Sequence, residues 1–236
     1  VSDVLDGKDI LVTGGPGSLG QAFIRRELAG GARRVVSFSR DELKAANLQA
    51  SFPDKRLRVF CGDIRDKSRL LQAMNGVDTV IAAAAMKIIE RCEEDPGEAK
   101  RTNIDGAENT ALAAIEAGVS KCLFISTDKS PLAATLYGMT KAVGERFFVN
   151  ANAYAARGKT SLACVRYGNV VSSRGAVVHL WKSQIAEGQP LTITDRRCTR
   201  FWLTLEQAVD LVCLALGEMR SGSIYIPKAP SSSIVA

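Results

Sequence analysis

The chain has 236 residues, 46% of them hydrophobic, which is enough to bury the core of one α/β domain. Its 31 lysines and arginines exceed its 25 acidic residues and give a formal net charge of +6, which suits phosphate-bearing ligands, but no block of basic residues indicates nucleic acid. The six cysteines form no C-x-x-C pair, and the N-terminus lacks the pattern of a signal peptide, so we expect a cytoplasmic protein with no bound metal. No apolar run reaches the ~18 residues of a membrane span, so we expect no such span.

Short apolar segments alternate with longer amphipathic ones, which is the pattern of a parallel sheet with crossover helices. Strands are predicted at residues 10–13, 34–38, 57–61, 79–82, 122–126 and 161–166, with helices between them. A last helix begins near Thr204, which has capping-box spacing to Gln207, and a further strand follows at 224–226. No later helix closes the fold, so we expect that C-terminal sequence is missing.

These elements predict the fold class: α/β, with a Rossmann-type doubly wound parallel sheet and helices on both faces. We expect residues 1–165 to form an NADP-binding domain that also carries the catalytic residues. Residues 166–236 are expected to form a partial substrate-binding region that returns to the sheet.

A glycine-rich turn follows the first predicted strand and opens a helix. Glycines at 14, 17 and 20 let the backbone approach a pyrophosphate at the positive end of the helix, while Pro16 removes one N–H from the turn. An ordinary glycine-rich turn is the alternative, and the strand before it and the helix after it disfavour that interpretation. The predicted cofactor contacts in this turn are Gly14, Pro16, Gly17, Ser18, Leu19 and Gly20.

The residues after the second strand bear on the choice between NAD and NADP. Arg40 offers a planar fork to a ribose 2′-phosphate, with Ser39 and Lys44 as further donors, and this predicts NADP. If Arg40 is instead a solvated charge and Asp41 binds the ribose hydroxyls, the cofactor is NAD, and that alternative remains open. The other cofactor contacts predicted after strands two to four are Asp41, Glu42, Asp63, Ile64, Ala83 and Ala84.

Polar residues after the fifth strand predict acid–base chemistry. Tyr137 and Lys141 are four apart and share one helix face, so the ammonium could lower the phenol pKa from about 10 and let Tyr137 exchange a proton with a sugar hydroxyl. Chance spacing is the alternative, and the preceding dinucleotide pattern and strand-end Thr127 favour function. Asp128 and Lys129 supply a second acid–base pair, which elimination of water requires, unless they are a helix cap and a surface lysine.

Taken together, these motifs resemble the inverting UDP-N-acetylglucosamine 4,6-dehydratases, which are extended short-chain dehydrogenases/reductases of the polysaccharide biosynthesis protein family. The resemblance extends through nearly the whole chain. It rests on residues 13–18, 39–44, 62–66, 84–87, 102–104, 126–129, 136–138, 166–171, 173–175, 199–202 and 226–228.

The resemblance implies a redox-neutral cycle in which Tyr137 takes the O4 proton, hydride passes from C4 to NADP and returns to C6, and Thr127 lies beside the reacting sugar. Lys129 would remove the C5 proton, and Asp128 would protonate the departing C6 hydroxyl. Dehydratases that retain the C5 configuration typically have glutamate in place of Lys129, so this lysine favours inversion, giving a UDP-4-keto-6-deoxy-L-hexosamine for surface polysaccharide or glycan biosynthesis.

Resemblance also implies a binding site for the UDP-sugar and a homo-oligomer, with Val170 beside the cofactor. The implied sugar-nucleotide contacts are Lys87, Asn169, Arg174, Gly175, Ala176, Val177, Val178, Leu191, Ile193, Thr194 and Arg200. The chain departs from its relatives at residues 88–90, where they usually have His-Val-Pro, in the loop 130–135 and at His179. Members of the family also extend further at the C-terminus.

Two other functions remain open. A UDP-sugar C4- or C5-epimerase would use the same Tyr137 and Lys141 without dehydration, and the adjacent Asp128 and Lys129 disfavour it. An NADP-binding redox sensor without catalysis could dispense with Tyr137 and Lys141, so their presence disfavours that function as well.

Overall fold

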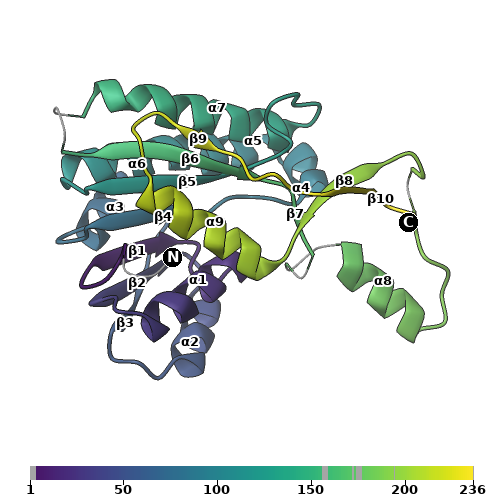
Figure 1. Ribbon diagram of the computed structural model, residues 1–236, viewed down its shortest axis with the longest axis horizontal. Coiled ribbons are helices and arrows are strands. Elements are labelled where there is room, and N and C mark those ends of the chain that lie inside the picture. Colours follow the sequence, from purple (N-terminus) through teal and green to yellow (C-terminus); the bar gives the residue numbers. More distant parts are fainter. Residues whose placement is uncertain (1–3, 156–158, 172, 174–176, 194, 236) are drawn as a thin grey trace.

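The computed structural model describes residues 4–155, 159–171, 173, 177–193 and 195–235 (Figure 1). Within these residues, the main sheet has seven strands in the order β3-β2-β1-β4-β5-β6-β9, and every pairing is parallel. The order reverses between β1 and β4, and at such a switch point the carboxyl ends of the strands leave a crevice for ligands. The strands are β1 (Asp9–Thr13), β2 (Arg34–Ser39), β3 (Leu57–Cys61), β4 (Thr79–Ala82), β5 (Lys121–Thr127), β6 (Ser161–Tyr167) and β9 (Ile224–Tyr225).

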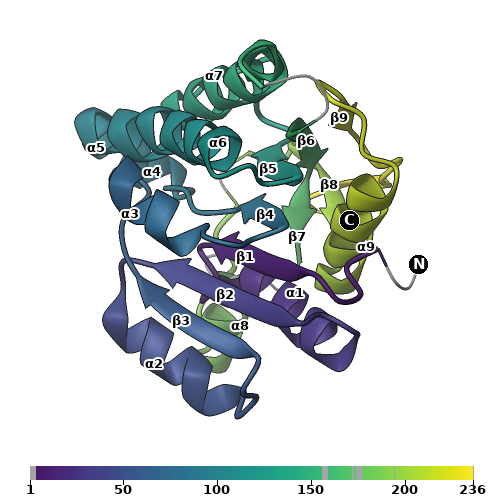
Figure 2. The same ribbon diagram turned by 90° about the vertical axis from the view of Figure 1, so that its left-hand side faces the viewer.

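Helices cover both faces of this sheet (Figure 2). One buried cluster joins the sheet to α1, α2 and α9, and a second joins it to α3, α6 and α7. The larger helices are α1 (Ser18–Ala29), α2 (Glu42–Ser51), α3 (Lys67–Ala73), α6 (Gly106–Glu116), α7 (Leu136–Asn150) and α9 (Leu205–Gly217). Short helices α4 (Ile89–Glu94) and α5 (Pro96–Lys100) and a π-helical turn at Arg101–Asp105 lead into α6.

The strands are apolar at consecutive positions in their central residues because helices cover both faces of the sheet. In β5, Cys122 and Phe124 face the α3–α6–α7 cluster, whereas Leu123 and Ile125 face the α1–α2–α9 cluster. Successive side chains point to opposite faces, so a strand that is covered on both sides must be apolar at consecutive positions. The predicted fold class is therefore confirmed.

The six strands predicted up to residue 166 are found with ends that differ by at most one residue. Helix α9 begins as expected, because Thr204 Oγ1 accepts a hydrogen bond from Gln207 N (3.2 Å) and Gln207 Oε1 accepts one from Thr204 N (2.8 Å). The strand expected at 224–226 is β9, which pairs with β6. None of the helices among the described residues is both long and apolar enough to cross a lipid bilayer.

A second, three-stranded sheet was not predicted. Strand β8 (Thr199–Leu203) pairs with β7 (Asn169–Val170) in parallel and with β10 (Ser231–Ser233) in antiparallel register. The strands β7 and β10 are too short to show an apolar alternation, and β10 is made of serines, so only the long-range pairing defines them. Helix α8 (Val177–Ala186) extends away from the main sheet, as Figure 1 shows, and buries none of its residues.

Candidate active site

The glycine-rich turn between β1 and α1 has the shape that a dinucleotide requires. Gly14 has a positive φ of 71°, and a Cβ atom there would come within 3.0 Å of Ala84 Cα. At Gly20 a Cβ would lie 2.5 Å from the carbonyl oxygen of Gly15, so only glycine lets α1 begin this close to the turn. Helix α1 is preceded by Gly17, which has no side chain to cap it, and has no acidic residue in its first turn. Its N–H groups therefore fit a pyrophosphate.

The other predicted residues of the turn support its shape. The carbonyl oxygen of Pro16 accepts a hydrogen bond from Gln21 Nε2 (2.9 Å), Ser18 is the first residue of α1, and Leu19 packs against the α1–α2–α9 cluster. After β4, the N–H groups of Ala83 and Ala84 both donate to Thr13 Oγ1 at 3.1 Å. This fixes the backbone of the β4 loop against β1.

At the end of β2, the predicted donors form ion pairs with acidic side chains. Arg40 Nη1 lies 3.1 Å from Glu98 Oε1 and 3.8 Å from Asp63 Oδ2. Arg65 contacts both carboxylates as well, at 2.6 Å to Asp63 and 2.8 Å to Glu98. Burial favours the neutral acid at Asp63, but the hydrogen bonds from Arg65 hold its pKa below the ordinary value. Glu98 was not predicted, since nothing near it in the sequence marks it.

Asp41 has a structural role at the start of α2. Its Oδ1 accepts a hydrogen bond from Lys44 N (2.9 Å) and its Oδ2 pairs with Lys44 Nζ (2.5 Å), and these contacts lower its pKa. Ser39 Oγ accepts from Asp41 N at 3.2 Å, while Glu42 is exposed in the first turn of α2. Ile64, the residue after Asp63, is buried in the core. Asp41 therefore serves as the N-cap of α2, and Arg40 extends beside it.

The loop after β4 is bound to α7 through Asn103, which was not among the predicted site residues. Buried Asn103 accepts a hydrogen bond from Met86 N (2.8 Å) and donates to Met86 O (2.9 Å) and to Thr140 Oγ1 (3.0 Å). Lys87, a predicted substrate contact, follows Met86 and is exposed. The loop that carries Lys87 is thereby held one helical turn from Tyr137.

The predicted acid–base residues Asp128 and Lys129 lie in the turn that follows β5. Lys129 Nζ lies 2.8 Å from Asp128 Oδ1, and Thr127 Oγ1 donates to the same carboxylate oxygen at 3.1 Å. Lys129 Nζ also donates to Asn169 Oδ1 in β7, at 3.3 Å. The turn thus brings together three predicted catalytic residues and one predicted substrate residue.

Tyr137 faces this turn from the first turn of α7. The side chain is half-buried, and loss of hydration raises the pKa of its phenol to about 12; the Thr127 hydroxyl acts in the opposite direction, and the Asp128 carboxylate raises the pKa further. Helix and turn are in close contact, because a Cβ at Gly138 would lie 2.5 Å from the carbonyl oxygen of Lys129. Tyr137, Asp128 and Thr127 therefore share one site.

Lys141 lies one turn further along α7 and is almost fully buried. Its Nζ is 3.8 Å from the centre of the Phe124 ring, and burial lowers its pKa to about 7, against a smaller opposite effect of Glu145. The sequence predicts that Lys141 lowers the pKa of Tyr137, but the structure shows the phenol pKa raised. The expectation on pKa differs from the structure because burial of the phenol raises its pKa, while the Lys141 ammonium contacts the Phe124 ring.

The other predicted substrate residues belong to the second sheet and the segment around α8. Val170 lies in β7, Val177 and Val178 begin α8, and Arg200 lies in β8, where its Nη1 donates to Thr199 O (2.8 Å). The residues Leu191 and Ile193 follow α8 in the chain. Arg174, Gly175, Ala176 and Thr194 lie outside the described residues.

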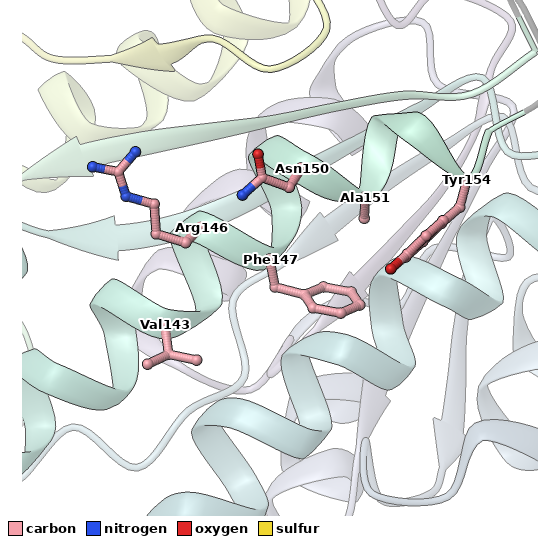
Figure 3. A pocket seen from close by; sticks show the side chains of 6 residues that line it. All are labelled: Val143, Arg146, Phe147, Asn150, Ala151 and Tyr154. Atoms are coloured by element: carbon pink, nitrogen blue, oxygen red, sulfur yellow. The ribbon is translucent and has the colours of Figure 1, made fainter.

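One pocket lies along the C-terminal half of α7 (Figure 3). It has a volume of about 250 Å³ and is lined by Val143, Arg146, Phe147, Asn150, Ala151 and Tyr154. These residues recur with helical spacing on a different face of α7 from the catalytic candidates, so the pocket is separate from the candidate active site.

Comparisons with known proteins agree with this geometry. The profile of a family described as polysaccharide biosynthesis protein matches residues 10–236. A UDP-N-acetylglucosamine 4,6-dehydratase (inverting) of Campylobacter jejuni subsp. jejuni serotype O:23/36 (strain 81-176) is 45% identical over 233 residues, which are 98% of this chain and 70% of that protein. A UDP-glucose 4-epimerase of Rickettsia akari (strain Hartford) is 38% identical over 231 residues, which are 96% of this chain and 68% of that protein.

Solved structures show the same fold. The X-ray structure of Pen from Bacillus thuringiensis matches with a TM-score of 0.95 at 36% identity, covering 98% of this chain and 72% of that chain. DesIV, a dTDP-glucose 4,6-dehydratase of Streptomyces venezuelae, matches with a TM-score of 0.84 at 24% identity, covering 95% of this chain and 77% of that chain. The resemblance predicted from the sequence is confirmed, and the chain belongs to the polysaccharide biosynthesis protein family.

Proposed function

We propose that this chain catalyses the dehydration of UDP-N-acetylglucosamine at C4 and C6 with inversion at C5. The product is a UDP-4-keto-6-deoxy-L-hexosamine for surface polysaccharide or glycan biosynthesis. The observation that carries the proposal is the contact of 2.8 Å between Lys129 Nζ and Asp128 Oδ1 beside Tyr137. A second acid–base pair next to a Tyr–Lys pair serves an elimination, and the relative that is 45% identical has the same named activity.

The cofactor is proposed to be NADP, and the glycine turn fits its pyrophosphate. Held at the glycine turn, NADP would supply the acceptor for the C4 hydride and the donor of the hydride to C6. Tyr137 takes the proton from O4, and buried Lys141 supplies a cation that favours the ionised phenol. Arg40, which is half exposed at the end of β2, provides the fork for the 2′-phosphate.

Elimination then depends on the pair that follows β5. The C4 ketone acidifies the C5 hydrogen, Lys129 removes that proton, and Asp128 protonates the C6 hydroxyl as it leaves as water. For these roles Lys129 must be neutral and Asp128 protonated, and a proton can move along their 2.8 Å contact to give both forms. Return of a proton to the other face of C5 inverts that centre.

We also propose that residues 1–165 bind the cofactor and residues 166–236 contribute to substrate binding. Two residues of 166–236 contact the 127–130 turn: Tyr167 O accepts from Asp128 N (2.9 Å) and Asn169 Oδ1 of β7 accepts from Lys129 Nζ (3.3 Å). The whole enzyme is proposed to be a cytoplasmic homo-oligomer.

A UDP-sugar epimerase is the second candidate, favoured by the relative that is 38% identical and is named UDP-glucose 4-epimerase. The deciding experiment incubates the protein with NADP and UDP-N-acetylglucosamine in heavy water and examines the product by mass spectrometry and NMR. Dehydration gives a product that has lost one water and carries deuterium at C5. A product of unchanged composition with altered stereochemistry would replace the dehydratase by the epimerase.

A further inference from the structure

A buried carboxylate that the reaction itself does not use lies behind the catalytic turn. Glu145 is 3% exposed and follows Tyr137 and Lys141 by two turns and one turn on the same face of α7. Carboxylates are rarely buried unless they are paired, because burial removes the hydration of the charge. The residues that pair with Glu145 therefore indicate its role.

One partner of Glu145 lies in strand β6 and another in the turn after β5. Arg166 of β6 forms a bidentate ion pair with it, with Nε 3.1 Å from Oε1 and Nη2 2.5 Å from Oε2. Ser130, the residue after Lys129, donates its hydroxyl to Oε1 at 2.5 Å and also lies 2.8 Å from the carbonyl oxygen of Thr127. Burial favours the neutral acid, but the contacts with Arg166, Ser126 and Ser130 hold the pKa of Glu145 below its ordinary value.

These contacts connect the 127–130 turn to β6 and to α7. Strands β5 and β6 pair so that Ser126 is opposite Arg166, and Asp128 N donates to Tyr167 O (2.9 Å) at the same end. Glu145 links that strand pair to α7 and, through Ser130, fixes the end of the turn that carries Lys129. Helix α7 lies over β5 and β6 in Figure 1. Glu145 therefore connects the 127–130 turn, which carries Asp128 and Lys129, to the helix that carries Tyr137.

We propose that Glu145 is a positioning residue that holds the 127–130 turn against α7, so that the Asp128–Lys129 pair and Tyr137 act on the same sugar. The inference rests on the proposed function. A displacement of about 1 Å at a reacting group can cost about 100-fold in rate. Glu145 is expected to matter chiefly for elimination, because its tie through Ser130 ends next to Lys129.

Two substitutions test this role from opposite ends of one contact. Glu145→Gln keeps the shape and removes the charge, whereas Ser130→Ala removes the hydroxyl and leaves the Glu145–Arg166 pair in place. Each variant is mixed with NADP and UDP-N-acetylglucosamine, and the absorbance of reduced cofactor and the loss of water are followed together. Glu116→Gln, which removes an exposed carboxylate paired with Lys67 at 2.7 Å, is the control.

In both variants we expect dehydration to slow about 10- to 100-fold, with reduced cofactor persisting and with KM and NADP affinity changed by no more than about twofold. Since both substitutions act on the same link between Glu145 and Ser130, their effects should not add, and the double variant should be no slower than the slower single variant. Dehydration at the wild-type rate in Ser130→Ala would overturn the proposal, and so would an equal loss of C4 oxidation, elimination and NADP affinity. If Glu145→Gln does not fold, Ser130→Ala decides alone. If the wild-type protein changes stereochemistry without releasing water, both the proposed function and the positioning role fail. If the wild-type protein releases water and both variants release it at the same rate, only the positioning role fails.

Discussion

Replacing Lys141 by methionine is expected to stabilise the cofactor-free protein and to change how its stability depends on pH. Lys141 is 3% exposed, and burial lowers its pKa from 10.5 to about 7. The unfolded chain therefore binds more protons between pH 7 and 10.5, so stability rises with pH in that range. At about 1.4 kcal/mol for each pH unit between the two pKa values, the lysine lowers the free energy of unfolding by about 4 kcal/mol at pH 7 and about 1 kcal/mol at pH 9.5.

The contact with Phe124 reduces this effect, since a cation–π interaction favours the charged lysine by about 0.5–2 kcal/mol. Methionine has a similar length and retains the packing of the stem. We therefore expect Lys141→Met to raise the free energy of unfolding by about 2–4 kcal/mol at pH 7 and by about 1 kcal/mol at pH 9.5.

Urea denaturation at pH 6, 7, 8.5 and 9.5 measures this difference, and Lys55→Met at an exposed position is the control. The variant should show a nearly flat profile where the wild-type protein gains stability with rising pH. A difference between the two proteins that is constant across these pH values, or a variant that is less stable than wild type at pH 7, would refute the reasoning.

Three further substitutions probe the cofactor site, the packing of α7 and the start of α9. Arg40→Ala should weaken NADP binding about 10- to 100-fold and leave NAD binding almost unchanged in calorimetric titrations, because it removes a charge-assisted contact to the 2′-phosphate; unchanged NADP affinity would count against the assignment. Gly138→Ala should lower the free energy of unfolding by about 1–3 kcal/mol in urea, since its Cβ would lie 2.5 Å from Lys129 O, and equal stability would show that the turn can move without strain. Thr204→Ala should lower stability by about 1 kcal/mol in thermal unfolding through loss of the capping box while turnover is kept, and a loss of turnover at unchanged stability would contradict this.

Local patterns in the sequence predict most of the fold. The strands are found where short apolar segments occur, because two covered faces require apolar residues at consecutive positions, as Cys122 to Ile125 show. The same reasoning places Thr127, Asp128 and Lys129 at a carboxyl end of the sheet, where their side chains do meet. The positions of the strands, and of the residues that follow each strand, can be predicted because they depend on patterns within a few neighbouring residues.

Contacts between distant segments could not be predicted in the same way. Nothing in the sequence around Glu145 or Arg166 indicates that they pair, because they lie 21 residues apart on different elements. Strand β10 likewise exists only through its pairing with β8. The raised pKa of Tyr137 depends on burial by the folded chain, which the spacing to Lys141 does not reveal.

The three-stranded sheet connects Lys129 to residues 231–233. Lys129 is bound to Asn169, β7 pairs with β8 through Asn169 and Trp202, and β8 pairs with β10 at residues 231–233. We therefore expect a ligand that shifts β8 to shift the amide oxygen of Asn169, which accepts the hydrogen bond from Lys129 Nζ. Ligand binding at the second sheet is then expected to change the orientation of the Lys129 ammonium group.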